Sequence, residues 1–539
     1  MFNQDNDMQK RTMIFFVVVA VLLIGYTAIN QYLHPPKQTE TQNQTQNIEN
    51  KKSENQNNIK TVKKHEKEKQ TTTYVSSGNY DLLLNNARFK SDDLKNVIEI
   101  KTSYGTVKIS KIGARVVSIF LNKYNTDVIE KVAKENKIFP TEIITTNPKI
   151  TALINFSKYK LKKEENRYIF ELKKDGIYIK KEFILNPDET ISYKLSYKGL
   201  ENLGIAVING ITPSKMGRAF GHHGAVIKTD KEIVKIDSDI KTTQIIRGNI
   251  IWAGEENKYF LQMIANKSGF STVYVMPIAK DTTATLSEIK GNLDGFFFGG
   301  PKLYSLLGQI NEKYKKQWNN DLSLRETISF GIFGILGKPL FLILHFIYNF
   351  VHNWALSIII ITVLLRIVLF PLNHKSLKAM KKMADLAPEI KKIQKKYKDD
   401  PQKLQAEMMR LYSEHGANPM SGCLPIVAQI PIFIALYNVL MVSVELKNVP
   451  FLWISDLSQQ DPYYILPILM GLSMIAQQWI TPSSDKNQKM IMYVMAGVFT
   501  FLFMSFPAGL VLYWLTNNIL GIGQSFLINK TMHKEGKKA

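Results

Sequence analysis

The sequence predicts a membrane α-helical bundle of six transmembrane helices joined to one large all-β domain. Three observations lead to this prediction. Apolar runs occur at Met13–Ile29 and repeatedly after Phe330, so the membrane segments lie at the two ends of the chain. The long region between them is polar, and short alternating runs separated by Gly, Asn, Asp and Pro fill most of it. The 539 residues are enough for about two to four domains.

The first apolar run begins just after Lys10 and Arg11 and is about 17 residues long, close to the lower limit for a spanning helix. It ends without a small-x-small cleavage site. Residues 1–30 are therefore predicted to be an uncleaved signal anchor with its N-terminus in the cytoplasm. Residues 31–73 contain hardly any apolar side chain, so we expect a disordered tether there.

Residues 74–325 have the pattern of an antiparallel β-sandwich. The clearest strand candidates are Asn96–Thr102, Thr106–Ile112, Arg115–Leu121 and Ile177–Leu185. The only cysteine of the chain is Cys423, so this domain is expected to be stable without an intramolecular disulfide.

Residues 326–530 are predicted to form the membrane core. Its first apolar stretch is too long for one span and is interrupted at Gly337-Lys338-Pro339, so residues 330–350 are either a span or a helix lying in the interface. Five later spans follow: Trp354–Phe370, Leu424–Val444, Tyr463–Ile480, Met490–Phe506 and Gly509–Ile528. With one N-terminal anchor, they place the Lys-rich segments 374–422, 482–489 and 531–539 in the cytoplasm, as the positive-inside rule requires. An additional span would invert all of them, which favours the interfacial helix.

The cytoplasmic segment 374–422 is predicted to contain a helical hairpin. Apolar residues recur at a 4-3-4 spacing from Leu386 to Tyr397 and at a 4-3 spacing from Leu404 to Leu411, and Asp400-Pro401 is a good start for the second helix. The first helix carries a lysine row, defined as Lys391, Lys392, Lys395 and Lys396. We expect this row to recruit ribosomal RNA, anionic headgroups or a nascent chain, beyond its contribution to topology.

Arg366 is the only charged residue of its predicted span, and a charge inside a span is a functional candidate by default. Gln429 lies at a similar depth in the next span, and the last span carries a polar stripe at helical spacing. These groups indicate either interhelical hydrogen bonds or a hydrated groove open to the cytoplasm; because no Asp or Glu lies within the spans, we favour the groove. The candidate groove residues are Arg366, Gln429, Trp514, Thr362, Asn517 and Asn518.

No catalytic set accompanies these residues. The spans contain no Asp pair, no His-Glu-x-x-His and no Gly-x-Ser-x-Gly, and the chain has no phosphate-binding Gly-x-x-x-x-Gly-Lys-Ser/Thr. His222 and His223 are adjacent and are not expected to converge on one substrate. We therefore expect neither an enzyme nor a cofactor or metal.

The C-terminal part of the chain resembles the YidC/Oxa/Alb family of membrane insertases, in its Gram-negative form. The matching stretches are Asn353–Ala355, Phe370–Leu372, Lys375-Ser376, Met380–Met383, Asn418-Pro419, Gly422–Pro425, Gln429–Tyr437, Trp453–Ser458, Asp461–Pro467 and Phe506–Trp514. Weaker matches in the β domain are Trp252–Gly254, Lys258–Phe260 and Gly300–Lys302.

This resemblance implies a five-helix insertase core in the cell inner membrane, with Arg366, Gln429 and Trp514 in its groove, and a periplasmic super-sandwich domain similar to sugar mutarotases. It also implies that nascent membrane proteins are the clients, inserted alone or beside the Sec translocon in contact with membrane lipids. Whether the ribosome is a further partner stays open. A lipid scramblase or transporter would use the same kind of polar groove and is the alternative function.

Overall fold

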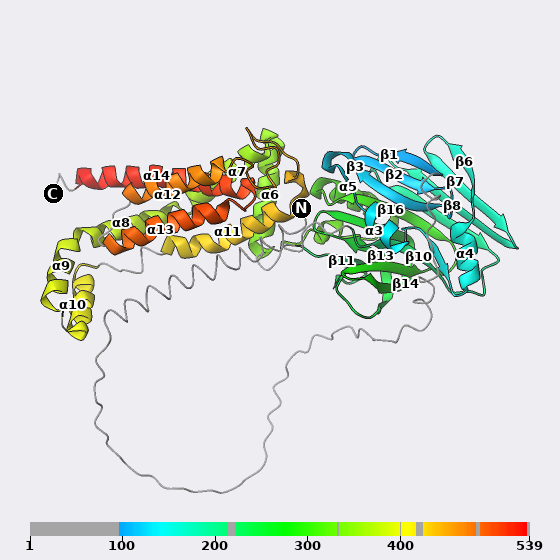
Figure 1. The fold of residues 1–539 in the computed structure, drawn as a ribbon, viewed down its shortest axis with the longest axis horizontal. Coiled ribbons are helices and arrows are strands. Elements are labelled where there is room, and N and C mark those ends of the chain that lie inside the picture. Colours follow the sequence, from blue (N-terminus) through cyan, green and yellow to red (C-terminus); the bar gives the residue numbers. More distant parts are fainter. Residues whose placement is uncertain are drawn as a thin grey trace, which may run out of the picture.

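The computed structural model describes residues 96–213, 221–330, 334–398, 400–416, 424–480 and 486–535, as a β domain followed by a helical bundle (Figure 1). The predicted anchor at residues 1–30, the tether at residues 31–73 and Cys423 lie outside the described residues.

The β domain contains two antiparallel sheets. The smaller sheet has four strands in sequence order. They are β1 (Val97–Lys101), β2 (Gly105–Ser110), β3 (Arg115–Leu121) and β4 (Thr126–Asp127). The four strand candidates are confirmed, because β1, β2, β3 and β8 (Ile177–Leu185) coincide with them within a few residues.

The larger sheet has twelve strands, of which nine run in the order β12-β11-β13-β14-β16-β9-β8-β7-β6. Besides β8, these are β6 (Lys160–Glu164), β7 (Arg167–Lys174), β9 (Ile191–Lys198), β11 (Gly224–Thr229), β12 (Ile233–Asp237), β13 (Gln244–Glu256), β14 (Phe260–Ala279) and β16 (Leu293–Pro301). The strands β5 (Ile143–Thr145), β10 (Ile205–Ile211) and β15 (Thr282–Glu288) pair off this path. Two short helices, α3 (Glu130–Asn136) and α4 (Pro148–Phe156), complete the domain.

Strand β16 is buried on both faces. Successive side chains of a strand point to opposite faces, yet Phe296, Phe297 and Phe298 are all buried. Phe297 belongs to the core between the sheets, whereas Phe296 and Phe298 pack on the other face. Helix α5 (Tyr304–Trp318) covers that face, where the ring of Tyr314 stacks on Phe296 at 4.0 Å. The apolar run of β16 therefore packs on one face against the core between the sheets and on the other face against α5.

The β domain and the bundle share one apolar cluster. It extends from Trp252 and Phe298 through Leu307 of α5 to Phe341 of α6 (Gly334–Val351). The short helix η3 (Leu324–Thr327) connects α5 to this region. The two parts are thus joined by packing as well as by the chain.

Polar contacts reinforce this junction at the loop that follows helix α11 (Leu424–Val442). The buried Glu445 accepts a hydrogen bond from the Tyr304 backbone N–H at 3.0 Å, and its carbonyl accepts one from Lys123 Nζ at 3.4 Å. Asn448 donates to the Lys123 carbonyl at 2.5 Å. Desolvation lowers the pKa of Lys123 against the opposing effect of the Glu445 carboxylate.

The helices of the bundle match the predicted later spans in position. They are α7 (Trp354–Val368), α11, α12 (Ile465–Ile480), α13 (Lys486–Phe503) and α14 (Ala508–Glu535). Among the described residues, only α6 is by itself long and apolar enough to cross a membrane, and the bent pair of α7 and α8 (Phe370–Asp385) would be a second such segment. The count of six spans therefore stays a prediction. So does the interfacial position of α6, which crosses the bundle at the end nearest the β domain (Figure 1).

Helix α8 is an element that sequence reasoning missed. It follows α7 after a bend of 62°, and Pro371 lies in its first turn. A proline there lacks the N–H that would continue the hydrogen-bond ladder of α7, so the chain changes direction and starts a new helix.

The helical hairpin is confirmed as two packed helices, α9 (Ala387–Lys396) and α10 (Pro401–Glu414). The Asp400 side chain caps α10 by accepting a hydrogen bond from the Lys403 N–H at 3.1 Å. Leu386, Ile390 and Leu411 form the buried seam between the helices.

Candidate functional site

Arg366 lies two residues before the C-terminal end of α7, with its side chain half-buried between helices. Its guanidinium packs against Gly521 of α14, where a Cβ atom would collide with Nη2 and would lie 3.0 Å from the Gln477 amide nitrogen of α12. The missing side chain at position 521 therefore creates the room that the guanidinium occupies.

Within the described part of the chain, no carboxylate forms an ion pair with Arg366, and its buried Nε has no hydrogen-bond acceptor. The electrostatic partner that the structure provides is the Tyr513 phenol of α14. The amide of Gln429, on α11, donates a hydrogen bond to the Tyr513 hydroxyl. Gln429, Tyr513 and Arg366 thus form a polar connection across three helices.

Tyr513 and Gln477 were missed by sequence reasoning. A signal for Tyr513 existed, because positions 513, 517 and 521 recur every four residues and share a helix face. The phenol also needs a partner when it is buried, as Tyr513 is. Gln477 had no comparable signal, since its relation to Arg366 depends on how α12 packs against α14.

The two asparagines of the last span have different surroundings. Asn518 is buried and donates a hydrogen bond to the Ser473 hydroxyl of α12 at 2.9 Å, which is an interhelical bond. Asn517 is half-buried and makes no hydrogen bond to any described residue. The structure therefore joins Asn518 to the helix packing and leaves Asn517 on the Tyr513 face.

Thr362 and Trp514 have other partners than Arg366. The buried Thr362 hydroxyl donates to the Ile358 carbonyl of its own helix at 2.6 Å. Trp514 packs edge-to-face on Phe433 at 4.9 Å and also contacts Phe503 at 5.2 Å. Of the predicted groove residues, the structure connects Arg366 to Gln429 through Tyr513 and places Trp514 in an aromatic cluster.

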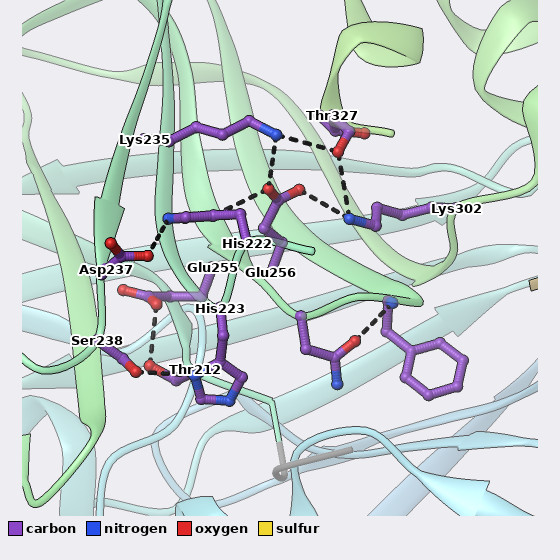
Figure 2. Close-up of polar contacts among 12 residues, drawn as sticks. Thr212, His222, His223, Lys235, Asp237, Ser238, Glu255, Glu256, Lys302 and Thr327 are labelled. Atoms are coloured by element: carbon purple, nitrogen blue, oxygen red, sulfur yellow. Dashed lines mark hydrogen bonds and ion pairs between the residues drawn. The ribbon is translucent and has the colours of Figure 1, made fainter. Parts of the chain in front are cut away.

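A second cluster of charged groups is buried in the β domain, around Glu256 at the end of β13 (Figure 2). Its carboxylate contacts Lys235 at 3.1 Å, Lys302 at 3.2 Å and His222 at 3.0 Å. Burial alone would raise the pKa of Glu256, but the two ammonium groups outweigh it and hold the pKa below its usual range. Both lysines also donate to the Thr327 carbonyl of η3, so the cluster holds the connection to the bundle in place.

The neighbouring Glu255 points to the opposite face of β13, and its environment is different (Figure 2). Thr212 and Thr283 donate to one carboxyl oxygen at 3.0 and 2.9 Å, while the other oxygen is buried without a partner among the described residues. Burial raises the pKa of Glu255 to about 8, so the group is mostly protonated at neutral pH.

The two adjacent histidines bind different partners. His222 contacts Glu256, and His223 lies 2.7 Å from the Ser238 hydroxyl. Among the described residues, no group of three or more His, Cys, Asp or Glu side chains could hold a metal ion.

Comparison with known proteins gives matches along the chain. A family model for the YidC periplasmic domain matches residues 97–343, and one for the 60Kd inner membrane protein matches residues 346–535. The membrane protein insertase YidC of Aquifex aeolicus is 37% identical, with 100% of this chain and 99% of that protein covered. The YidC of Campylobacter jejuni is 31% identical with the same coverage. A crystal structure of an active YidC insertase shares 18% identity and a TM-score of 0.41, covering 81% of this chain and 92% of that one.

Proposed function

Because the chain belongs to the YidC family of membrane protein insertases, we propose that it inserts clients from a hydrophilic groove around Arg366 that is open to the cytoplasm. Its β domain lies in the periplasm, both termini lie in the cytoplasm, and the bundle lies in the cell inner membrane. Nascent membrane proteins are the substrates, received alone or from the Sec translocon. No chemical step and no cofactor are needed for this activity.

The observation that carries the proposal is the half-buried guanidinium of Arg366, which has no carboxylate partner among the described residues. A charge at membrane depth is costly unless water or a counter-charge reaches it. Since the described helices place the Tyr513 phenol and the Gln477 amide near the guanidinium but no counter-charge, we infer that water solvates the cation. This supports a hydrated groove bounded by α7, α11 and α14.

Such a cation lowers the cost of bringing a polar client tail into the membrane. The tail exchanges bulk water for the guanidinium, the Gln429 amide and groove water, and an acidic tail gains an additional attraction. The apolar client segment meanwhile moves along exposed side chains of α7 such as Leu364 and Ile367, and its burial in lipid drives the process.

The lysine row of α9 supports recruitment. All four lysines lie on the hairpin, which projects from the end of the bundle opposite the β domain (Figure 1). We assign this surface to contacts with clients, ribosomes or anionic lipid headgroups at the cytoplasmic entrance of the groove.

The test compares Arg366→Lys and Arg366→Ala with two clients that differ only in whether the translocated tail carries Asp and Glu. Protease protection of the tails reports insertion. Arg366→Lys is expected to retain most activity, and Arg366→Ala to lose about tenfold or more for the acidic client, because a hydrogen bond to a charged group contributes roughly 1.5–3 kcal/mol. Arg410→Ala is the matched control, since Arg410 is an exposed arginine paired with Glu414 on α10.

An equal loss for both clients, together with a marked fall in melting temperature, would assign Arg366 a structural role and refute the electrostatic mechanism. Unchanged insertion with a loss of lipid flip-flop across vesicles would instead support the scramblase alternative.

A further inference from the structure

A pocket of about 410 Å³ lies where α7 bends into α8 and the end of α14 passes by. Its lining residues are Phe370, Pro371, His374, Lys375, Leu527 and Ile528. The volume is in the range of pockets that hold small ligands. The pocket begins about one helical turn beyond Arg366 and contains none of the groove candidates.

The walls of the pocket are apolar and continue onto an exposed apolar surface. Phe370 and Leu527 are 48% and 61% exposed, and the adjacent Ile367 and Phe526 are 62% and 59% exposed. In a membrane bundle such side chains face lipid chains. An occupant of the pocket can therefore extend from it into the acyl region of the bilayer.

Two side chains, Lys375 and His374, supply the polar groups of the pocket. The Lys375 side chain is exposed, and the His374 ring stacks on Phe370 with its Nδ1 buried away from the pocket opening. The ammonium group of Lys375 can donate hydrogen bonds to an anion, and Nε2 of His374 can do so when it carries the proton. Residues 367–384 contain four lysines and no acid, so the pocket lies in a positive field. These groups favour an occupant that joins an anion to an apolar chain.

The size of the pocket distinguishes a lipid from a client helix. An α-helix is about 10 Å across with side chains, so a single turn of about 5.4 Å already fills roughly 400 Å³. The pocket is open on one side, so it cannot enclose a transmembrane client segment, whereas a single acyl chain can lie within it. Basic pockets between helices on the cytoplasmic side are also a recurring form of headgroup site.

We propose that this pocket binds an anionic phospholipid, with its phosphate at Lys375 and His374 and one acyl chain against Phe370, Leu527 and Ile528. The site is separate from the client groove, and its occupation fixes the bend between α7 and α8 one turn from Arg366.

The test uses the full-length protein, delipidated in detergent, and native mass spectrometry with phosphatidylglycerol or phosphatidylethanolamine of identical chains. Phosphatidylglycerol is expected to bind more tightly, and Lys375→Gln to weaken it about fivefold, as one lysine near a headgroup implies. Leu527→Asn is expected to weaken both lipids. Lys198→Gln, which removes an exposed lysine at the end of β9 in the β domain, is the matched control and is expected to leave binding unchanged.

Equal binding of the two lipids with no response to Lys375→Gln would overturn the proposal. Displacement of phosphatidylglycerol by glycerol 3-phosphate at a similar concentration would also overturn it, because the site would then recognise the anion alone. A photoreactive group at position 527 is expected to label lipid in membranes; labelling of a client chain instead would assign the pocket to clients. Because Lys375 is exposed, its substitution leaves the packed core intact, so these outcomes do not depend on a folding defect.

Discussion

Replacing Glu255 with Gln is expected to make the β domain more stable at neutral pH and to remove a pH dependence. The folded carboxyl has a pKa of about 8, whereas its ordinary value is 4.5. The folded state therefore keeps a proton that the unfolded chain releases above pH 4.5, so stability falls as the pH rises from about 4.5 to about 8. Gln keeps the acceptor for Thr212 and Thr283 but cannot ionise.

The magnitude follows from the two pKa values. Between pH 5 and pH 7 the cost of the carboxyl grows by about 2–3 kcal/mol, at 1.36 kcal/mol per pKa unit. Lys181 has the opposite effect. Burial lowers its pKa to about 7, so above pH 7 the folded state loses a proton that the unfolded chain keeps, and stability rises with pH. The window from pH 5 to pH 7 therefore isolates Glu255 from this opposing group.

Amide hydrogen exchange of strands β13 and β14 measures the effect. At each pH the protection factor of the variant is divided by that of the parent, which cancels the intrinsic exchange rate. This ratio of protection factors is expected to rise by roughly 30- to 150-fold from pH 5 to pH 7, as 2–3 kcal/mol implies. Asp294→Asn, which removes an exposed carboxylate of the same domain, is the control. Parallel pH profiles for the parent and Glu255→Gln would refute the assigned protonation state.

Three further predictions follow from individual contacts. Asn518→Ala is expected to lower the melting temperature in detergent, because it removes the hydrogen bond to Ser473 and with it about 1 kcal/mol of stability. Asn517→Ala is expected to change the melting temperature little. The opposite order would refute the assignment of Asn518 to helix packing. Asp400→Ala is expected to increase hydrogen exchange in α10, because it removes the cap that accepts from the Lys403 N–H and destabilises the helix by about 1 kcal/mol. Unchanged exchange would show that the cap is not needed. Replacing the lysine row with Gln is expected to weaken ribosome or client binding in sedimentation assays, most at low salt, and salt-independent binding would argue against a recruiting role.

Local chemistry in the sequence predicts the elements that depend on it. The cap at Asp400 and the apolar seam from Leu386 are contained in short stretches, and the structure confirms the hairpin they predict. The alternation in Ile177–Leu185 likewise predicts β8. Helix α8 was missed because Pro371 and a run of lysines are typical of a loop as much as of a first helical turn.

Relations between distant segments could not be predicted in the same way. The link from Gln429 through Tyr513 to Arg366 depends on the rotation of three helices about their axes, which hydrophobic spacing defines only coarsely. The contrast between Glu255 and Glu256 depends on which face of β13 each occupies, and two irregularities in its pairing with β14 precede them. A sequence pattern does not reveal such bulges.

The apolar cluster shared by the β domain and the bundle determines where the chain can be cut. Removing the strands while keeping everything from Phe330 onward would expose Phe341 and its neighbours to water on the periplasmic side. It would also remove the hydrogen bonds of Glu445 with Tyr304 and Lys123. Failure of a shortened protein to insert clients would therefore not show by itself that the strands are needed for activity, because the exposed apolar surface would have the same effect. Deletions that retain α5 and η3, with polar residues in place of the strand contacts, separate these two causes.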